Sequence, residues 1–270
     1  MHFGYSLPVA LIHPSFMDAV VAIGFDDGAG KRQYAATGFL YGRFREQVGD
    51  RKTYNVYLVT NRHVLEGARI VWVRFNPQGD EPAREYHLDL FDPAGERMWF
   101  FHEDPAVDLA VVSLNADVLR NDKLKFGIFQ DDYHVATCEM AREIGISEGD
   151  GVFVLGFPIG IVGDHRNFVI ARGGIIARIG DALCGRSKEI LLDVTIFPGN
   201  SGGPVITKPE VVAITGTTPV SASYLIGVVQ GYVPYQDIAI SSQTNRPRII
   251  FEENSGLTSV IPIDQHHTFG

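Results

Sequence analysis

The pattern of short apolar runs constrains this chain more than any other feature. Runs rich in β-branched and aromatic residues recur between clusters of Gly, Asp, Asn and Pro, which is typical of strands and the turns that join them. No stretch holds a helical period over several turns, so amphipathic helices are not expected to build the core. We therefore predict an all-β chain.

Two groups of strands are predicted, one on either side of a polar segment. The first group lies at residues 19–25, 33–41, 55–60, 69–75, 86–91, 98–101 and 109–114. The second group lies at residues 152–155, 168–171, 174–179, 190–196, 205–207, 224–229, 248–251 and 259–263. The first two strands are expected to form a hairpin around residues 26–30, and the charged residues 43–52 a solvated hairpin tip.

The polar segment between the groups indicates two domains. Alternation is lost from about residue 130 to residue 149, where acidic residues accumulate, as is typical of a connecting segment. The 270 residues, of which 45% are hydrophobic, suffice for a sizeable core in each half. We predict a first β-barrel over residues 1–128, a linker over 129–149 and a second β-barrel over 150–270.

Charge and residue content argue against several classes of protein. A net charge of −9 argues against general binding to the phosphate backbone of nucleic acids. No run approaches the ~18 apolar residues that a membrane span requires. No Cys/His group has the spacing of a zinc site, so neither a metal nor another cofactor is expected.

The N-terminus and the cysteines suggest a compartment. Residues 1–6 lack the basic region of an export signal. Cys138 and Cys184 are too few for a framework of several disulfides, although one bridge is compatible with their number. These observations predict a cytoplasmic protein with two free thiols.

A serine surrounded by glycines is the strongest chemical signal. Residues 197–205 read Phe-Pro-Gly-Asn-Ser-Gly-Gly-Pro-Val and follow an apolar strand. Glycines let a carbonyl group approach backbone N–H groups, so this loop can present Ser201 Oγ beside an oxyanion hole formed by the N–H groups of Gly199 and Ser201. A Gly-Ser pair alone would indicate only a hairpin turn, and the nine-residue context is far more specific.

A nucleophilic serine needs a base and a group that orients this base. His63 lies at the polar end of the strand at 55–60, where an imidazole can face a cleft, and Asp108 precedes the apolar run 109–114. A partly buried carboxylate there can hold one tautomer of the imidazole. Taken singly, a histidine at a strand end indicates a surface or capping residue, and an aspartate before a strand indicates a turn.

Together these segments resemble the trypsin-like peptidase superfamily, and most closely its bacterial HtrA/Deg branch. The motifs that carry the resemblance are Thr60-Asn61-Arg62-His63-Val64, Asp108-Leu109-Ala110-Val111 and Gly199-Asn200-Ser201-Gly202-Gly203-Pro204. Residues 36–40, 156–160, 226–229 and 260–262 are similar to four further motifs of that branch, and all seven occur in its order.

The resemblance implies a chymotrypsin fold of two antiparallel six-stranded β-barrels with the active site in the cleft between them. It further implies a serine endopeptidase in which His63 and Asp108 come from the first barrel and Ser201 from the second. His63 would take the serine proton, Asp108 would stabilise the imidazolium, and the N–H groups of Gly199 and Ser201 would hold the oxyanion.

Carried over by position, the resemblance also implies where a protein or peptide substrate would bind. The specificity pocket is expected to be lined by Thr195, Ile196 and Val229, and the substrate backbone is expected to pair with Gln230-Gly231-Tyr232. A pocket without a carboxylate disfavours Lys and Arg, whose charge would be buried and unpaired. Small or medium apolar side chains are therefore expected at the cleavage site.

Two departures from the family's pattern change what is expected of regulation. In digestive trypsin-like enzymes a new N-terminal ammonium pairs with an aspartate just before the serine, whereas Asn200 carries no charge. The HtrA/Deg branch usually adds a PDZ domain, which the residues after Pro262 are too few to form. Control is therefore expected from loop ordering, a protein partner or self-assembly.

Two alternatives stay open. Residues 199–203 also fit the G-x-S-x-G pattern of an α/β-hydrolase, with His266 or His267 as the late histidine. That fold needs a helix after the serine, however, and residues 204–206 read as a strand. The other alternative is a protease-like barrel that is catalytically silent and only binds a protein. The presence of all three triad candidates favours the peptidase.

Overall fold

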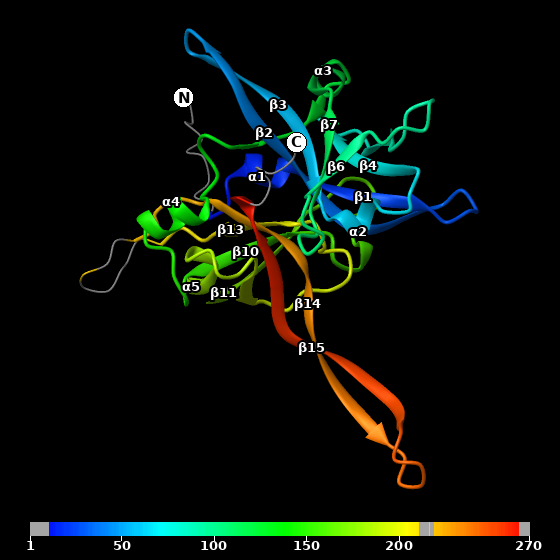
Figure 1. Ribbon diagram of the computed structural model, residues 1–270. Coiled ribbons are helices and arrows are strands. Elements are labelled where there is room, and N and C mark those ends of the chain that lie inside the picture. The colour runs from blue at the N-terminus through cyan, green and yellow to red at the C-terminus, as the bar shows by residue number, and fades with distance from the viewer. Residues whose placement is uncertain (1–10, 211–215, 217–218, 265–270) are drawn as a thin grey trace, which may run out of the picture.

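The computed structural model describes residues 11–210, 216 and 219–264, which form two halves built from strands (Figure 1). The first half contains α1 (Pro14–Ala19), β1 (Val20–Asp26), β2 (Arg32–Val48), β3 (Arg51–Thr60), α2 (Arg62–Leu65), β4 (Ile70–Pro77), β5 (Arg84–Asp89), β6 (Trp99–Phe101), β7 (Ala110–Leu114), α3 (Ala116–Asn121), β8 (Leu124–Lys125) and β9 (Phe129–Gln130). Its strands form one sheet in the order β5-β4-β1-β2-β3-β7-β6, with β8 paired to β4 and β9 to β2.

The second half is a closed barrel in the order β10-β11-β12-β15-β14-β13. Its elements are α4 (Cys138–Glu143), β10 (Gly151–Gly156), the 3-10 turn η1 (Pro158–Gly160), β11 (Ile170–Arg178), α5 (Gly180–Leu183), β12 (Ile190–Asp193), β13 (Pro204–Thr207), β14 (Leu225–Ile240) and β15 (Pro247–Pro262). Every strand pair in this barrel is antiparallel.

The predicted all-β, chymotrypsin-like class is confirmed, with three differences in detail. Six strands close the second barrel as expected, whereas nine strands build the first sheet. The predicted strands 168–171 and 174–179 are one strand, β11, and those at 248–251 and 259–263 are one strand, β15. The predicted hairpins form between β1 and β2 and between β2 and β3. The division at residues 128 and 149 stays a prediction.

Five short helices were not expected from the sequence. None of α1 to α5 exceeds six residues, which is less than two turns and too short for a helical period to appear. One of them, α4, lies inside the predicted linker. In the described ranges no helix is long and apolar enough to cross a membrane.

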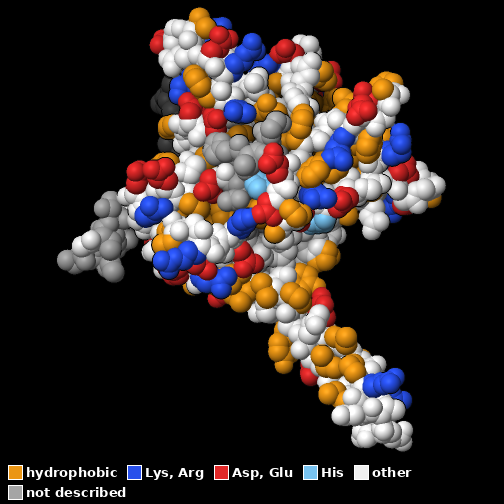
Figure 2. Space-filling model, in the orientation of Figure 1, with side chains coloured by type: hydrophobic (Ala, Val, Ile, Leu, Met, Phe, Trp, Pro, Cys, Tyr) orange, Lys and Arg blue, Asp and Glu red, His pale blue; other side chains and the backbone are white. Residues whose placement is uncertain are grey.

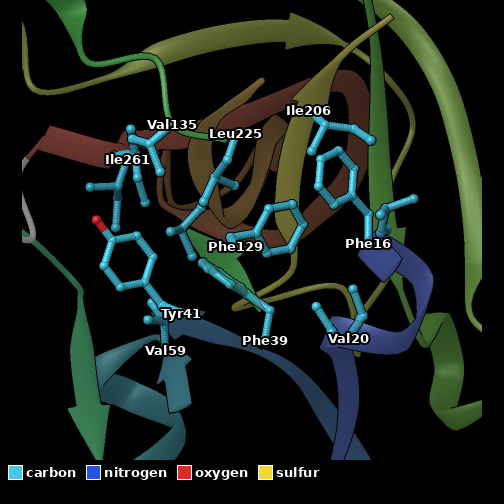
Figure 3. Packing of buried hydrophobic residues seen from close by; sticks show 14 of the residues in the cluster. Phe16, Val20, Phe39, Tyr41, Val59, Phe129, Val135, Ile206, Leu225 and Ile261 are labelled. Atoms are coloured by element: carbon cyan, nitrogen blue, oxygen red, sulfur yellow. The ribbon is translucent and has the colours of Figure 1, made fainter. Parts of the chain in front are cut away.

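A shared core joins the two halves (Figure 3). From the first half, Phe16 of α1 stacks on Phe129 with ring centroids 4.7 Å apart, and Phe39 of β2 meets the same ring edge-on at 5.5 Å. From the second half, Leu225 and Ile261 are buried in this cluster. The apolar contact between the halves therefore fixes how the first sheet and the barrel face each other.

One long hairpin extends beyond the barrel. Beyond Tyr232, strands β14 and β15 continue to pair from Pro234↔Asn254 to Ile240↔Pro247. This ribbon, residues 234–254, is called the arm below, and it projects away from the rest of the molecule (Figure 1). The sequence pattern did not predict it.

Both cysteines are unpaired, as predicted. Burial, together with the neighbouring Asp264, raises the pKa of the Cys138 thiol to about 12. The Cys138 Sγ lies 3.5 Å from Asp264 Oδ1. A thiol in this environment stays protonated at neutral pH and is a poor nucleophile.

Two histidines that are wholly or partly buried make the stability of the fold depend on pH. Burial holds the pKa of His134 below its ordinary value of 6.5, and the repulsion of His13 acts in the same direction. His134 Nδ1 accepts the N–H of Gln130 at 3.1 Å, a bond that only the unprotonated nitrogen can accept. Burial and Lys188 likewise lower the pKa of His102.

The unfolded chain therefore takes up protons below pH 6.5 that the folded chain takes up only at lower pH. We expect the free energy of unfolding to fall as the pH drops from about 7 to about 5, and the His134→Gln variant to show a shallower fall over this range. Urea unfolding of both proteins across this pH range measures the free energy of unfolding at each pH. An equal slope for wild type and variant would contradict the assignment to His134.

Candidate active site

His63 and Asp108 form a pair held by two contacts. His63 lies in α2, directly after β3 ends at Thr60. Asp108 Oδ2 lies 2.5 Å from His63 Nδ1, while Asp108 Oδ1 accepts the backbone N–H of His63 at 2.9 Å. The carboxylate thus satisfies a first-turn N–H of the helix and orients the ring at the same time.

The position of Asp108 is fixed by its neighbours. Val107 and Leu109 are buried, so the backbone on either side of Asp108 is anchored in the core. Asn61, which is fully buried, donates its side-chain N–H to the backbone carbonyl of Asp108 at 2.8 Å. Because Asn61 precedes α2, the same residue ties the histidine segment to the aspartate segment.

The histidine faces solvent. The side chain of His63 is 52% exposed and that of Asp108 is 20% exposed. An open cleft of about 430 Å³ lies beside His63, lined by Phe25, Ala35, Ala36, His63, Val64, Glu66, Gly67 and Ala68. Nε2, the ring nitrogen that does not contact Asp108, is thereby available for proton transfer.

The serine loop needs its glycines. Gly199 has φ +99°, and a Cβ there would lie 2.4 Å from the carbonyl oxygen of Phe157. Gly202 has φ +82°, and a Cβ there would lie 2.2 Å from the carbonyl oxygen of Thr37. A side chain at either position would therefore push the loop away from β2 and from the segment that follows β10.

Thr37 joins the serine loop to both halves of the molecule. Its hydroxyl donates to the carbonyl of Gly199 at 2.6 Å and accepts the N–H of Phe157 at 3.0 Å. Its backbone N–H donates to the carbonyl of Ser201 at 3.0 Å, and its own carbonyl accepts the hydroxyl of Thr60 at 2.9 Å. Since Thr37 is fully buried, these bonds have no competition from water.

Replacing Thr37 with valine keeps the shape and removes the hydroxyl. The N–H of Phe157 and the carbonyl of Gly199 would then lose a buried partner, so we expect the free energy of unfolding to fall by about 1 to 3 kcal/mol. If the N–H of Gly199 binds the oxyanion, then loss of the Thr37 bond to Gly199 should displace this donor and lower kcat by about 100-fold. Urea unfolding and steady-state kinetics measure the two effects.

Thr244→Val, in the exposed turn at the end of the arm, is the matched control and should behave as wild type. A Thr37→Val variant with wild-type stability would contradict the role of this hydroxyl.

Two backbone N–H groups of the serine loop are unbonded, and they are the two that were predicted to form the oxyanion hole. Neither Gly199 N–H nor Ser201 N–H has a hydrogen-bond partner in the part of the chain that the structure describes. The neighbouring bonds of the loop are all formed, since Asn200 N–H donates to Phe197 O at 3.0 Å and Gly203 N–H to Asn200 O at 2.9 Å. Two free donors in an otherwise bonded loop are able to bind an anionic oxygen.

Asn200 is uncharged and fully buried. Its Oδ1 accepts the N–H of Phe197 at 3.2 Å. Its Nδ2 has no hydrogen-bond partner among the residues that the structure describes. The residue thus shapes the loop through a side-chain amide without an ion pair.

Ser201 and His63 come from different halves of the molecule, and a short series of hydrogen bonds through Thr37 connects their segments. Ser201 is bonded through its carbonyl to Thr37, which is bonded in turn to Thr60, three residues before His63. No hydrogen bond joins Ser201 Oγ to His63 among the described residues. In proteins without bound substrate such bonds are often long and tighten only in the complex, so direct proton transfer between them stays a prediction.

The residues predicted to line the specificity pocket differ in exposure. Thr195 is exposed, whereas Ile196 and Val229 are buried in the barrel core. Sequence reasoning missed Thr258, whose fully buried hydroxyl donates to Val194 O at 2.5 Å, next to Thr195. In the sequence, Thr258 could have been noticed as the one polar residue among the buried positions of the final strand.

The predicted substrate strand has an open edge. β14 pairs with β13 up to Val228, and Val229 exchanges two backbone bonds with the serine loop, to Gly202 and Gly203. From Gln230 to Tyr232 that edge of β14 has no strand beside it within the described ranges. An extended peptide can add to such an edge and would lie next to the serine loop.

Comparison with known proteins identifies the family. The pattern of the trypsin-like peptidase domain matches residues 36–214, and the chain belongs to this family. A relative from Marinomonas sp. (strain MWYL1), named probable periplasmic serine endoprotease DegP-like, is 28% identical over 179 residues. The match covers 65% of this chain and 30% of the relative.

The chain is also similar to a solved structure titled atomic resolution structure of HBP, with 12% sequence identity and a TM-score of 0.49. The match covers 95% of this chain and 90% of that one.

The predicted cytoplasmic location is wrong. It is contradicted by the name of the DegP-like relative, which is periplasmic. The prediction rested on the composition of residues 1–6, which lie outside the described residues, and on the small number of cysteines.

Proposed function

We propose that this chain is a serine endopeptidase with His63, Asp108 and Ser201 as its catalytic triad. The observation that carries the proposal is the double contact of Asp108 with the ring and the backbone of His63. The Thr37 bonds to Gly199 and Ser201 support it, because they hold the serine loop against the strand junction that leads to His63. Membership of the trypsin-like peptidase family agrees with it.

The proposed reaction uses these groups in two stages. Ser201 Oγ attacks the carbonyl carbon of a peptide bond while its proton passes to His63 Nε2, and the proton then passes to the leaving amine as the C–N bond breaks. A water molecule next gives a proton to His63 Nε2 as its oxygen attacks the carbonyl carbon of the acyl-enzyme. His63 then passes this proton to Ser201 Oγ as the acyl C–O bond breaks, which releases the new carboxylic acid and restores the serine hydroxyl. Asp108 stabilises the imidazolium in both stages.

The negative charge that develops on the substrate oxygen would be bound by the serine loop. The free N–H groups of Gly199 and Ser201 are the proposed donors. Each such donor contributes about 3 to 4 kcal/mol to stabilisation of the transition state in a related peptidase. Thr37 acts as a positioning residue, since it fixes the Gly199 carbonyl.

Small or medium apolar side chains are the proposed preference at the residue before the cleaved bond. The groups beside Thr195 are neutral, namely the Thr258 hydroxyl on Val194 O and the Asn254 amide on Ile196 O. A Lys or Arg side chain would find no carboxylate among these groups. The backbone of Gln230 to Tyr232 would pair with the substrate on the open edge of β14.

Cleavage of a random peptide library, read by mass spectrometry, tests this function. We expect wild type to cut after small or medium apolar residues and Ser201→Ala to cut nothing. Cleavage after Lys or Arg would refute the pocket and leave the triad standing. Equal cutting by both proteins would refute the triad, and no cutting by wild type would favour the silent protein-binding alternative.

Given the relative's name, we also propose a periplasmic location.

A further inference from the structure

The arm exposes six large hydrophobic side chains. Its large hydrophobic residues are each about half exposed, namely Tyr235, Ile238, Ile240, Ile249, Ile250 and Phe251. Hydrophobic side chains lie along much of the length of the arm in the space-filling view (Figure 2). A two-stranded ribbon on its own is marginally stable in water, and an exposed apolar patch of this kind marks an interaction surface.

The outer edge of β15 is unpaired along the arm. β15 pairs with β12 only from Leu257↔Asp193 to Val260↔Ile190. From Pro247 to Gly256 its only strand neighbour in the described part of the chain is β14. A free edge that carries apolar side chains is a template for another strand.

The sequence of this edge is complementary to itself. Residues 248–252 read Arg-Ile-Ile-Phe-Glu, with a base at one end, an acid at the other and three apolar residues between them. When two copies lie antiparallel about Ile250, Arg248 of each faces Glu252 of the other. Ile249 of each then faces Phe251 of the other, and Ile250 faces its own copy. Directly opposite residues share a face of the sheet and contact each other.

The charges on the β15 side of the arm agree with this antiparallel alignment. Arg246 and Arg248 lie towards the end of the arm, and Glu252 and Glu253 lie nearer the barrel. All four are exposed. A parallel alignment would oppose like charges, which is unfavourable. In the antiparallel alignment Arg246 falls opposite Asn254, so the pairing covers β15 to the end of the arm and stops before the residues that pair with β12.

We propose that the arm is a dimerisation element that pairs with the arm of a second copy of this chain. The two β15 strands meet edge to edge around a two-fold axis at Ile250 and form a four-stranded sheet in the order β14-β15-β15-β14. Each copy presents the same surface to the other, as a two-fold interface requires. The outer edge of β14 stays free, so Gln230 to Tyr232 remain open.

The molar mass in solution tests this proposal. All proteins carry Ser201→Ala, which removes any self-cleavage and makes the readout independent of peptidase activity. Sedimentation equilibrium of this chain should give the mass of two chains. Arg248→Glu and Glu252→Arg each oppose like charges at both ends of the interface and should weaken self-association by roughly tenfold or more. Arg45→Glu, on the exposed β2–β3 hairpin, is the matched control and should leave the mass unchanged.

Charge complementation provides the decisive result. The two single variants restore both opposite-charge pairs when they are mixed, so Arg248→Glu and Glu252→Arg should form a one-to-one heterodimer in native mass spectrometry. The double variant should self-associate again. A chain that sediments as a monomer, or variants that do not prefer each other, would overturn the proposal. Binding of such a monomer to neutral lipid vesicles would show that the arm has a different occupant.

Discussion

Replacing Ser201 with alanine is expected to lower kcat by about a million-fold, and His63→Ala is expected to do the same. The serine is inert until its proton is removed, and the histidine has no function in the reaction without the serine. The two residues act as one unit, so the double variant should be no slower than either single variant. Steady-state kinetics on a peptide that wild type cleaves measure kcat for the two single variants and the double variant.

The control for this experiment is Ser221→Ala, at an exposed serine away from the loop, which should keep wild-type kcat. Unfolding curves should show that each variant remains folded. Additive losses in the double variant would contradict the account, because they would mean that Ser201 and His63 act in separate steps.

The second large effect is expected for Asp108→Asn, with a loss in kcat of about ten-thousand-fold. The asparagine keeps the shape and its Oδ1 can still accept the N–H of His63, a bond of 2.9 Å in this structure. Its Nδ2, however, would donate to His63 Nδ1 where the carboxylate now accepts. The ring would then carry its proton on Nε2, the nitrogen that must receive the proton from the serine.

This prediction separates a chemical role from a structural one. We expect KM and the free energy of unfolding of Asp108→Asn to change little, while kcat falls. Asp117→Asn, on the exposed face of α3, is the matched control and should have no effect beyond that of a surface ion pair. An Asp108→Asn variant with wild-type kcat would exclude Asp108 from the triad.

Most strands of the fold were predictable because each is marked by its own local pattern of apolar residues between turn residues. β1, β3 and β7 alternate or run apolar between turn residues, and each lies within a few residues of its predicted range. The length of β14 and β15 was not predictable, since apolar and polar residues mix on both faces of the arm. Asn254 and the positive φ of Gly256 interrupt the pattern within β15, so one strand resembled two.

The candidate site was predictable to a similar degree. The motifs located His63, Asp108 and Ser201, and the structure adds the contacts of the first two. Thr37 and Asn61 were inside the quoted motifs but had no role there. Their importance comes from hydrogen bonds to residues 162 and 47 positions away, and such distant partners leave no trace in local sequence.

The most direct test of the central claim is labelling with a fluorophosphonate, which reacts covalently with an activated serine. Native wild type, heat-unfolded wild type and Ser201→Ala would be treated in parallel, and the adduct located by peptide mapping. The account predicts one adduct, on Ser201, in the native wild type alone. Labelling of Ser201→Ala to the same extent as wild type, or a native wild type that takes up no label, would contradict it.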